Sequence, residues 1–289
     1  MSVSVVIPTT GRPSLAAAIA SVLTQGAAVH EVIVVADTAD EISVPSDPRV
    51  ILLRSGPRAG GNAARMKGII EATGTIIGLL DDDDVWHPDK LEKQLAAVGD
   101  AVDDTHWLSS SYVTRSSGVI WPERPIGDDE DLADYLFRKT ALRGGQGALH
   151  TSTLLFPRAL AIEAPFDTTL RFHQDTAWLL RLRRQVPALR VFQVASSLVS
   201  LFDDGPASVS KSITAEGSLK WMHGHLTGVT PRTRGDFIMT VPYFYALRKN
   251  DYRAALRCLV EAFVYGPPSL YGSLSAVTIP IKLRQANNL

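Results

Sequence analysis

Residues 75–99 read TIIGLLDDDDVWHPDKLEKQLAAVG and combine three features that decide the fold. The apolar run at 75–80 has the length and β-branched content of a buried strand. Four aspartates, Asp81–Asp84, follow it directly, and an amphipathic helix begins after them, with Pro88 near its first position. Neighbouring carboxylates raise one another's pKa unless a cation relieves them. The stretch therefore predicts a strand, a charged connection and a helix, with a cation site at the connection.

The segments before this stretch show the same alternation of strand and helix. Strand-like runs lie at 3–8, 31–37 and 49–55, and helical spacing lies at 13–26 and 60–74. Alternation of this kind predicts an α/β domain with a mostly parallel central sheet and helices on both faces. Ligands of such sheets bind beyond the carboxyl ends of the strands, which is where Asp37 and the four aspartates fall.

The second half of the chain is less regular. We expect a strand pair at 106–115 and 118–122, a helix at 126–139, a strand and short helix at 151–160, and a loop leading into a helix at 166–185. After Ser210 the spacing becomes helical. We expect a catalytic domain at 1–215 and a helical C-terminal region at 216–289, which would serve the acceptor side, a homodimer contact or a membrane-surface contact.

The composition sets outer bounds on function. The 289 residues are 45% hydrophobic and 20% charged, with a net charge of −1, so nothing draws the whole chain to nucleic acid. Cys258 is the single cysteine, which excludes an intramolecular disulfide and a zinc site of several thiolates. No apolar stretch reaches 18 residues, so we expect no transmembrane segment. We expect a cytoplasmic protein, with attachment to the inner face of the membrane as an alternative.

The aspartate run has a functional and a structural interpretation. Mg²⁺ and Mn²⁺ prefer oxygen ligands and commonly bridge protein carboxylates to substrate phosphates, so Asp-x-Asp at a strand end indicates a metal and diphosphate site. The structural alternative is a solvated loop whose last members cap the next helix, as Asp84 and Asp89 could do.

Four further residues are candidates on weaker grounds. Asp37 ends a strand, where aspartates also form turns. Arg65 follows Gly60-Gly61 on a helix and offers a planar donor fork to a base or phosphate, or lies on the surface. Asp175 precedes the apolar spacing of a helix, so it is either a general base or an N-cap. His173 is a candidate for acid/base or metal chemistry, or for a local hydrogen bond.

Taken together, these segments resemble the family 2 glycosyltransferases, which have the GT-A fold. The similarity rests on VSVVIPTTGRP, EVIVVAD, GGNAARMKGIIEATG, IIGLLDDDDVWHPDKLEKQLAAV, TSTLLFPRAL and FHQDTAWLLRL, in the family's order over about the first 200 residues. The resemblance implies transfer of a sugar from a nucleoside diphosphate sugar to a carbohydrate or small-molecule acceptor, with inversion at the anomeric carbon.

The resemblance also implies a role for each donor-side candidate. Pro8, Thr9 and Thr10 correspond to the family's first loop, which meets the nucleoside. Asp37 corresponds to the acid that binds the base, usually uracil. Arg65 corresponds to an arginine near the nucleotide.

On the reaction side, the resemblance assigns the outer positions of the Asp-x-Asp motif to Asp81 and Asp83. Asp83 is expected to bind Mn²⁺ or Mg²⁺, and Asp82 is expected to reach the ribose. Asp175 corresponds to the catalytic base.

Several positions depart from the family pattern. Thr10-Gly11 stands where Tyr-Asn is common, and Gln174 stands before Asp175 where Glu is common. A histidine that helps to bind the metal is missing, and Asp203 or Asp204 would be its substitute. The Gln-x-x-Arg-Trp signature of processive synthases is absent, which favours transfer of a single sugar. The glycine-rich segment 142–150 is expected to order over donor or acceptor.

Two other functions remain open from the sequence. A phosphatase or phosphotransferase of the haloacid dehalogenase type would use Asp81 as nucleophile and Asp83 as acid/base, but that family places its motif on the first strand and follows it with Thr. A catalytically inactive nucleotide-sugar-binding protein would keep the donor residues alone. A sugar-nucleotide pyrophosphorylase is disfavoured, because its glycine-rich loop after the first strand is missing.

Overall fold

The computed structural model describes residues 2–140, 147–202 and 213–287, and the chain divides into two compact units. The first unit comprises Met1–Pro125 and Leu149–Gly205, and the second comprises Ile126–Ala148 and Pro206–Leu289. Residues 126–148 thus belong with the C-terminal helices, whereas the sequence had placed them in the first domain. Their helix buries Phe137 against Trp221 and Phe237, a contact distant in sequence that local spacing does not reveal.

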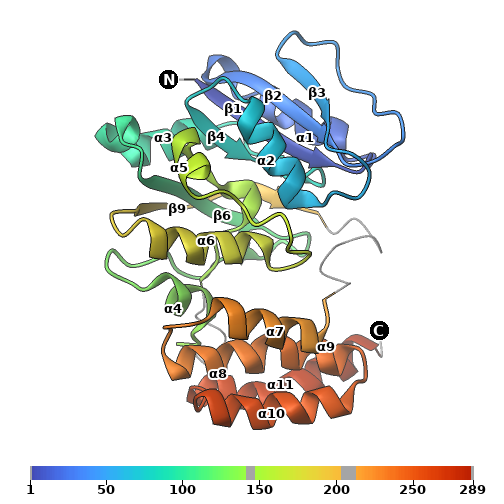
Figure 1. Ribbon diagram of the computed structural model, residues 1–289, viewed down its shortest axis with the longest axis vertical. Coiled ribbons are helices and arrows are strands. Elements are labelled where there is room, and N and C mark those ends of the chain that lie inside the picture. Colours follow the sequence, from blue (N-terminus) through green and yellow to red (C-terminus); the bar gives the residue numbers. More distant parts are fainter. Residues whose placement is uncertain (1, 141–146, 203–212, 288–289) are drawn as a thin grey trace. The chain divides into compact units, whose positions relative to one another are not determined.

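In its described residues, the first unit is built on a mixed sheet of nine strands (Figure 1). They are β1 (Val3–Thr9), β2 (Val29–Ala36), β3 (Val50–Arg54), β4 (Ile76–Leu79), β5 (Asp84–Trp86), β6 (Trp107–Thr114), β7 (Ile120–Trp121), β8 (Leu155–Pro157) and β9 (Arg190–Leu201). The order is β3-β2-β1-β4-β8-β6-β9-β5, with β7 beside β6. The first four positions are parallel, as expected from the alternating sequence. Beyond β4 the sheet combines parallel and antiparallel pairs.

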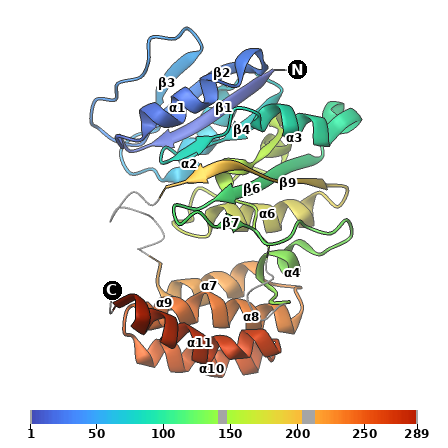
Figure 2. The same ribbon diagram turned by 180° about the vertical axis from the view of Figure 1, so that it is seen from behind.

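Helices cover both faces of this sheet, as the sequence predicted (Figures 1 and 2). One face carries α2 (Gly61–Glu71), α5 (Arg158–Glu163) and α6 (Gln174–Gln185), and the other carries α1 (Leu15–Leu23) and α3 (Lys90–Val98). The approach of α2 to β1 requires a glycine, because a Cβ on Gly68 would lie 2.4 Å from a methyl of Val6. On α6, Trp178 packs against Phe156 of β8 and so anchors the start of this helix near the strand ends.

Two strands were not predicted from the sequence. β9 is the longest strand, and β5 begins within the aspartate run itself. The two pair antiparallel, with Asp84 opposite Leu201 and Trp86 opposite Val199. This pairing joins residues more than 100 positions apart, so it could not be read from the local pattern. It fixes the backbone of Asp84 at the edge of the sheet.

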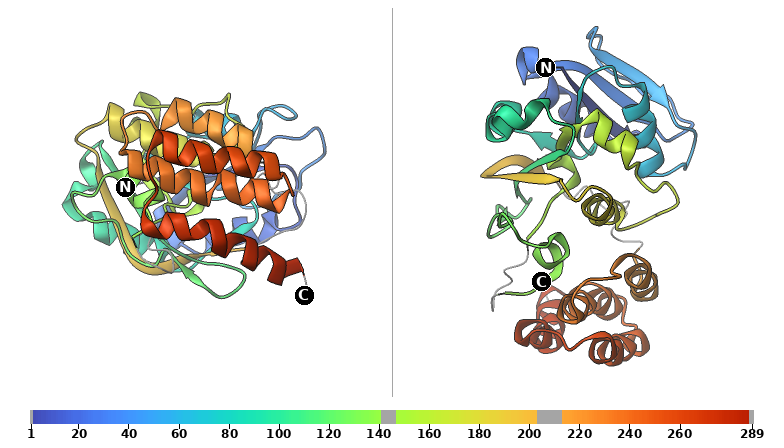
Figure 3. Two further views of the ribbon diagram at one scale, coloured as in Figure 1. Left: turned by 90° about the horizontal axis from the view of Figure 1, so that it is seen from below. Right: turned by 60° about the vertical axis from the view of Figure 1, so that its left-hand side comes forward.

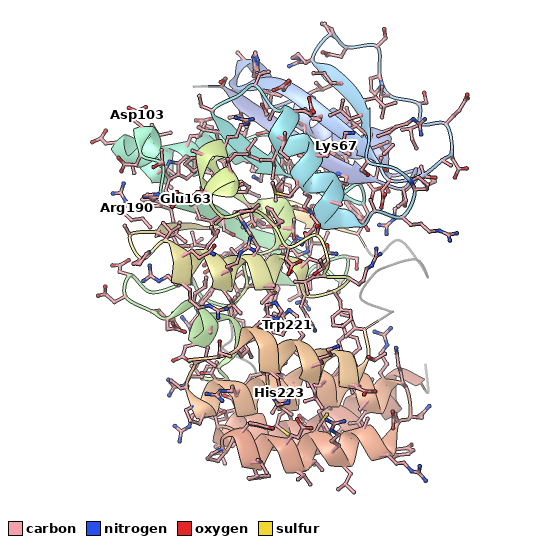
Figure 4. The ribbon with its side chains drawn as sticks, viewed as in Figure 1. Lys67, Asp103, Glu163, Arg190, Trp221 and His223 are labelled. Atoms are coloured by element: carbon pink, nitrogen blue, oxygen red, sulfur yellow. The ribbon has the colours of Figure 1, made fainter. Side chains whose placement is uncertain are left out.

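The second unit is helical. It contains α4 (Leu132–Phe137), α7 (Ala215–His225), α8 (Pro231–Thr240), α9 (Pro242–Arg248), α10 (Tyr252–Tyr265) and α11 (Leu270–Asn287). Figure 4 labels two side chains of α7: Trp221 packs against Phe237, and His223 lies 3.3 Å from a carboxylate oxygen of Glu261. Asp236 is fully buried and accepts a hydrogen bond from the Ser269 amide, which ties α8 to the start of α11. Among the described residues, no helix is long and apolar enough to cross a bilayer.

Candidate functional site

The carboxyl ends of β1, β2 and β4 meet at one edge of the sheet and bring three predicted residues together. The Thr9 hydroxyl donates to Asp82 Oδ2 at 2.6 Å. The Asp37 amide donates to the Thr9 carbonyl at 2.8 Å. All three side chains are buried, while Pro8 is partly exposed within β1 and Thr10 is exposed just beyond it. The first loop therefore lies between the end of β2 and the aspartate run.

The Asp37 carboxylate organises the loop that leads into α2. Its Oδ1 accepts from the Ala59 amide at 2.7 Å and from the Ser55 hydroxyl at 3.3 Å, and its Oδ2 accepts from the Gly60 amide at 2.8 Å. A carboxylate has about four lone-pair positions, so at least one remains for another donor. Asp37 thus combines a structural role with capacity to bind a ligand.

Each of the four aspartates has a different partner. Asp81 forms an ion pair with Arg65, at 2.6 Å between Oδ1 and Nη2. Asp82 accepts from Thr9, and Asp83 pairs with the guanidinium of Arg12.

Asp84, the last of the four, is almost fully buried and accepts a hydrogen bond from the Ser152 hydroxyl. The four aspartates therefore divide by partner. Asp81 faces α2, Asp82 and Asp83 face the first loop, and Asp84 lies within β5 and is held by Ser152.

The cluster carries more negative charge than its two arginines neutralise. Burial raises the pKa of Asp83 to about 6, with the charges of Asp81 and Asp82 adding to the effect and Arg12 opposing it. Burial and the charge of Asp81 raise the pKa of Asp84 to about 8. Burial also raises the pKa of Asp82. A further cation at this edge would relieve the excess charge.

Asp81 is the exception within the cluster. Burial opposes its ionisation, but the guanidinium of Arg65, followed by His150, outweighs burial and lowers the pKa of Asp81. Asp81 is therefore ionised at neutral pH, and its negative charge contributes to the raised pKa values of Asp83 and Asp84.

The donor atoms present suit a hard divalent cation shared with a ligand. They are carboxylate oxygens, which Mg²⁺ and Mn²⁺ prefer. Among the described residues, no group of three or more His, Cys, Asp or Glu side chains is placed to hold a metal alone. Such ions are commonly bound through one or two carboxylates together with substrate phosphates, so the set fits that mode and not a closed protein cage. Asp203 and Asp204, the predicted substitutes for a histidine ligand, lie outside the described residues.

A short 3₁₀ turn, Thr151–Thr153, connects the aspartate run to Asp175. The Thr151 hydroxyl donates to Asp175 Oδ2 at 3.2 Å. The next residue, Ser152, donates to Asp84 and accepts from the Asp81 amide at 3.1 Å. Two neighbouring side chains of one turn thus hold both parts of the candidate site.

Asp175 is not the N-cap of α6. His173 occupies the cap position, with φ 53°, and makes no capping hydrogen bond through its side chain. Asp175 is the second residue of the helix, and its Oδ1 accepts from the Thr176 amide at 2.7 Å. The capping interpretation of Asp175 is therefore wrong in position. Oδ2 contacts Thr151, and the side chain is partly exposed.

Arg65 links α2 to the start of α6 as well as to Asp81. Its Nη1 donates to Gln174 Oε1 at 3.2 Å, and the Gln174 amide nitrogen donates to the Leu170 carbonyl at 2.7 Å. A Cβ on Gly61 would lie 3.1 Å from both Arg65 and Gln174, so the absence of a side chain there admits this contact. The buried Nε of Arg65 has no hydrogen-bond partner among the residues that the structure describes.

The sequence did not single out Arg12, Thr151, Ser152 or His150. Arg12 lies four residues after Pro8, in the first loop of the family resemblance. A positively charged residue in a loop expected to lie near the four aspartates was the signal that could have identified it. The other three precede and begin the strand-like segment 151–160, where nothing local announces a contact with residue 84 or 175. Of the predicted loop 142–150, residues 142–146 lie outside the described residues.

Comparison with known proteins places this site in a family. A profile described as "Glycosyl transferase family 2" matches residues 4–155, which include all of β1 but its first residue, the aspartate run and the 3₁₀ turn. The chain belongs to glycosyl transferase family 2. The S. aureus protein TarS, solved as residues 1–349 in complex with UDP-GlcNAc, superposes with a TM-score of 0.55 at 12% identity, covering 100% of this chain and 92% of that one. The GT-A fold expected from the sequence is thereby confirmed.

Curated relatives share part of their length with this chain. The amylovoran biosynthesis glycosyltransferase AmsB of Erwinia amylovora is 34% identical over 44% of this chain and 42% of its own. The putative colanic acid biosynthesis glycosyl transferase WcaA of Escherichia coli is 30% identical over 62% of this chain and 65% of its own. An Escherichia coli UDP-Glc:alpha-D-GlcNAc-diphosphoundecaprenol beta-1,3-glucosyltransferase, WfgD, is 33% identical over 33% of this chain and 40% of its own. The chain thus matches about two fifths to two thirds of these relatives.

Proposed function

We propose that the protein is an inverting glycosyltransferase that moves one sugar from a nucleoside diphosphate sugar to an acceptor hydroxyl. The observation that carries the proposal is the 3₁₀ turn Thr151–Thr153, which ties a carboxylate cluster suited to a diphosphate-bound cation to a separate, partly exposed carboxylate, Asp175. Transfer with inversion requires these two parts: one that receives the leaving group and one that takes a proton from the attacking hydroxyl.

The donor nucleotide would bind at the ends of β1 and β2. The first loop, Pro8–Thr10, lies beside Asp37, whose carboxylate retains a lone pair for a base N–H. Asp82, fixed by Thr9, is the candidate for the ribose hydroxyls. UDP is the favoured nucleotide. Support comes from the family, whose member WfgD is named for UDP-Glc, and from the fold shared with TarS in complex with UDP-GlcNAc.

The diphosphate would bind beside Asp83, with Asp81 close by. When bound, Mn²⁺ or Mg²⁺ would offset the negative charge that grows on the leaving diphosphate. Asp83 is the principal candidate ligand, because it is partly exposed and its ion pair with Arg12 only partly offsets the repulsion from Asp81 and Asp82, whereas Asp84 is almost fully buried. Arg12 adds a permanent positive charge on the same side and would pair with a phosphate oxygen when the metal takes Asp83.

Asp175 would act as the general base. Its Oδ1 is fixed by the Thr176 amide and its Oδ2 by Thr151, so the side chain is oriented while partly exposed to an entering acceptor. The hydroxyl proton passes to this carboxylate as the acceptor oxygen bonds to the anomeric carbon and the diphosphate departs. No protein nucleophile is required, because inversion is a single displacement.

The acceptor would be a polysaccharide, a glycolipid or a small natural product. The relatives named for amylovoran, colanic acid and a diphosphoundecaprenol-linked sugar support the first two classes.

The donor side is tested by thermal unfolding with nucleoside diphosphates in the presence and absence of Mn²⁺. A ligand that binds only the native state stabilises it by about 2.7 kcal/mol when present at one hundred times its Kd. UDP with Mn²⁺ should raise the Tm, and Asp83→Ala should abolish the metal-dependent part. Asp89→Ala is the matched control, because Asp89 is an exposed aspartate paired with Lys93 outside the cluster. Equal stabilisation by UDP with and without metal would refute the role of Asp83.

The base is tested with Asp175→Asn. The amide oxygen can still accept from the Thr176 amide, so the fold and UDP binding should be unchanged. Loss of the proton acceptor should lower kcat by about 10²–10⁴-fold. Asp167→Asn changes a partly exposed loop aspartate that precedes the same helix, and it should leave kcat unchanged. Unaltered turnover by Asp175→Asn would show that this carboxylate has a structural role only.

The phosphatase alternative gains no support. The aspartates follow the fourth strand along the chain, whereas that class carries its nucleophile on the first, and Asp81 is held by Arg65. Release of phosphate from simple esters at rates exceeding sugar transfer would reverse this judgement.

A further inference from the structure

Two helices of the second unit carry most of the exposed apolar surface that the structure describes. Of the sixteen large hydrophobic side chains exposed in the described residues, ten lie on α10 and α11. These ten, here called the α10–α11 face, are Tyr252, Leu256, Val260, Phe263, Val264, Tyr265, Leu270, Leu274, Val277 and Ile281. Exposed apolar residues are ordinary when scattered, but a concentration of this kind indicates an interaction surface.

The spacing places nine of these side chains on one side of each helix, because their steps of three or four residues have the period of a helix face. Tyr265 is the exception: it ends α10 next to Val264, and its ring packs against His223 of α7. The opposite side of α10 is buried through Ala255, Cys258 and Ala262. The face is therefore the outer side of a helix already packed through its inner side, and it is not needed for the core of the unit.

The two helices lie in one layer. Both pack on α8 and α9, and both are seen in the foreground when the molecule is viewed from below (Figure 3, left). They follow each other in the chain through a four-residue connection, 266–269. Their outer sides thus belong to the same side of the second unit.

Positive charge borders the face. Residues 213–289 contain nine Lys and Arg but four Asp and Glu, although the whole chain has a net charge of −1. Arg248 and Lys249 are exposed at the end of α9, Arg253 is exposed at the start of α10, and Arg257 is exposed one turn further on. Of the nearby acids, Asp251 caps α10 by accepting from the Ala254 amide, and Glu261 is paired with Arg257.

We propose that the α10–α11 face docks on the surface of a bilayer that contains anionic lipids. An amphipathic helix with apolar and aromatic residues on one side and Arg or Lys beside them lies in the plane of the headgroups, with its apolar side in the acyl boundary. Tyr252 stands at the start of α10 and is 69% exposed, and tyrosine rings favour the membrane interface. Since no described helix can span a bilayer, the contact is a surface contact.

Charge favours an anionic bilayer over a second copy of the chain as the occupant. A second copy using the same face would bring its own Arg248, Lys249 and Arg253 to this positively charged border, and like charges across an interface are unfavourable. Anionic headgroups complement them, and each Lys or Arg near such a surface adds to binding.

The experiment is flotation of the full chain with phosphatidylcholine vesicles that contain or lack phosphatidylglycerol. We expect the protein to float with the anionic vesicles and to be released by salt, because the charge contribution is screened. Binding that ignores vesicle charge, or no binding at all, overturns the proposal.

A double variant, Leu256→Glu with Phe263→Glu, places charge within the face. Both positions are more than 60% exposed, so the fold should be retained, as circular dichroism would verify. We expect its partition onto anionic vesicles to fall by about tenfold or more. The control is Ile51→Glu with Val119→Glu, two exposed apolar residues of the first unit, which should bind as the parent does.

Sedimentation equilibrium of the same proteins provides the competing outcome. A dimer that the face variant abolishes, without vesicle binding by the parent, would overturn the proposal in favour of a second copy. The face variant should keep its thermal shift with UDP and Mn²⁺. Vesicle binding and donor binding are separate measurements, so the failure of one does not imply the failure of the other.

Discussion

The ion pair between Arg65 and Asp81 should be a principal stabilising contact of the site, and Arg65→Met tests it. The Arg65 side chain is 10% exposed and that of Asp81 is 27% exposed. Breaking a buried pair by removing one partner costs about 3–5 kcal/mol, and an exposed pair contributes about 0–1 kcal/mol. Since this pair is largely but not fully buried and Gln174 also loses a donor, we expect a loss of about 2–3 kcal/mol.

The assay is urea unfolding without nucleotide or metal, followed by tryptophan fluorescence. Trp86, Trp107 and Trp178 are buried in the first unit and report its unfolding. With a slope of about 2–3 kcal/mol/M, the midpoint of Arg65→Met should fall by about 1 M. A double-mutant cycle with Asp81→Asn should show a coupling of about 1–2 kcal/mol, because the two groups are in contact.

Arg49→Met is the matched control for this cycle. Arg49 pairs with Asp47 in the same unit at 2.9 Å, but the two side chains are 33% and 25% exposed. Its removal should cost about 1 kcal/mol or less. Equal midpoint shifts for Arg65→Met and Arg49→Met would show that burial does not strengthen the Arg65–Asp81 pair. Additive effects of Arg65→Met and Asp81→Asn would show that the two groups are not coupled, and either result would refute the prediction.

Two pH-dependent effects should appear away from the site. Burial opposes ionisation of Glu31, but hydrogen-bond donors that include Ser4 and the Thr73 amide outweigh burial and lower its pKa. Its contribution to stability is therefore complete above about pH 4.5, the unfolded-state value, and is lost as the pH falls through the folded-state pKa. Glu31→Gln should therefore cost about 1–2 kcal/mol at neutral pH, and a urea titration should find the difference from the parent vanishing in acid. Lys90 is fully buried against the Trp86 ring, and burial lowers its pKa far below the usual value of about 10.5. As the pH falls below about 10.5, the unfolded chain takes up a proton at Lys90 before the folded chain does, so the folded state loses stability. The parent Tm should rise with pH above neutrality, and Lys90→Met should flatten that rise; parallel profiles would contradict the buried-charge explanation.

The sequence predicted the half of the fold that is locally encoded. Strands β1 to β4 and helices α1 to α3 follow one another with short connections, so the period of apolar residues and the positions of Gly and Pro suffice to find them. β5 and β9 were missed because their pairing joins residues 84–86 to residues 199–201. The pairing energy of such strands lies in a partner that local spacing does not reveal.

The site shows the same division. Asp37 and Asp82 were predicted together because parallel strands end at one edge, and the resemblance to the family added Thr9. Arg12, Thr151 and Ser152 were not predicted, because their importance comes from side-chain partners 24 to 71 residues away. The resemblance to family 2 glycosyltransferases located Asp175, but only the structure shows which side chain holds it.

Gln174 illustrates why a departure from the family pattern need not weaken the site. It stands where Glu is common, and it both accepts from Arg65 and donates to the Leu170 carbonyl. A glutamate could accept from Arg65 but could not donate to that carbonyl. Since Asp81 already neutralises Arg65, a neutral amide satisfies both neighbours without adding charge.

The four aspartates are best understood as an unequal set whose charge is only partly compensated before a ligand arrives. Asp81 is neutralised by Arg65, which lets it remain ionised. Its charge then adds to burial in raising the pKa of Asp83 to about 6 and that of Asp84 to about 8. A cation beside Asp83, as the proposed function requires, would offset the repulsion that Asp81 and Asp82 impose on it, and this relief would add to the affinity for a metal–diphosphate pair. The same argument favours Asp83 over Asp84 as the proposed ligand: Asp84 shares the raised pKa, but it is almost fully buried within β5 and accepts a hydrogen bond from Ser152.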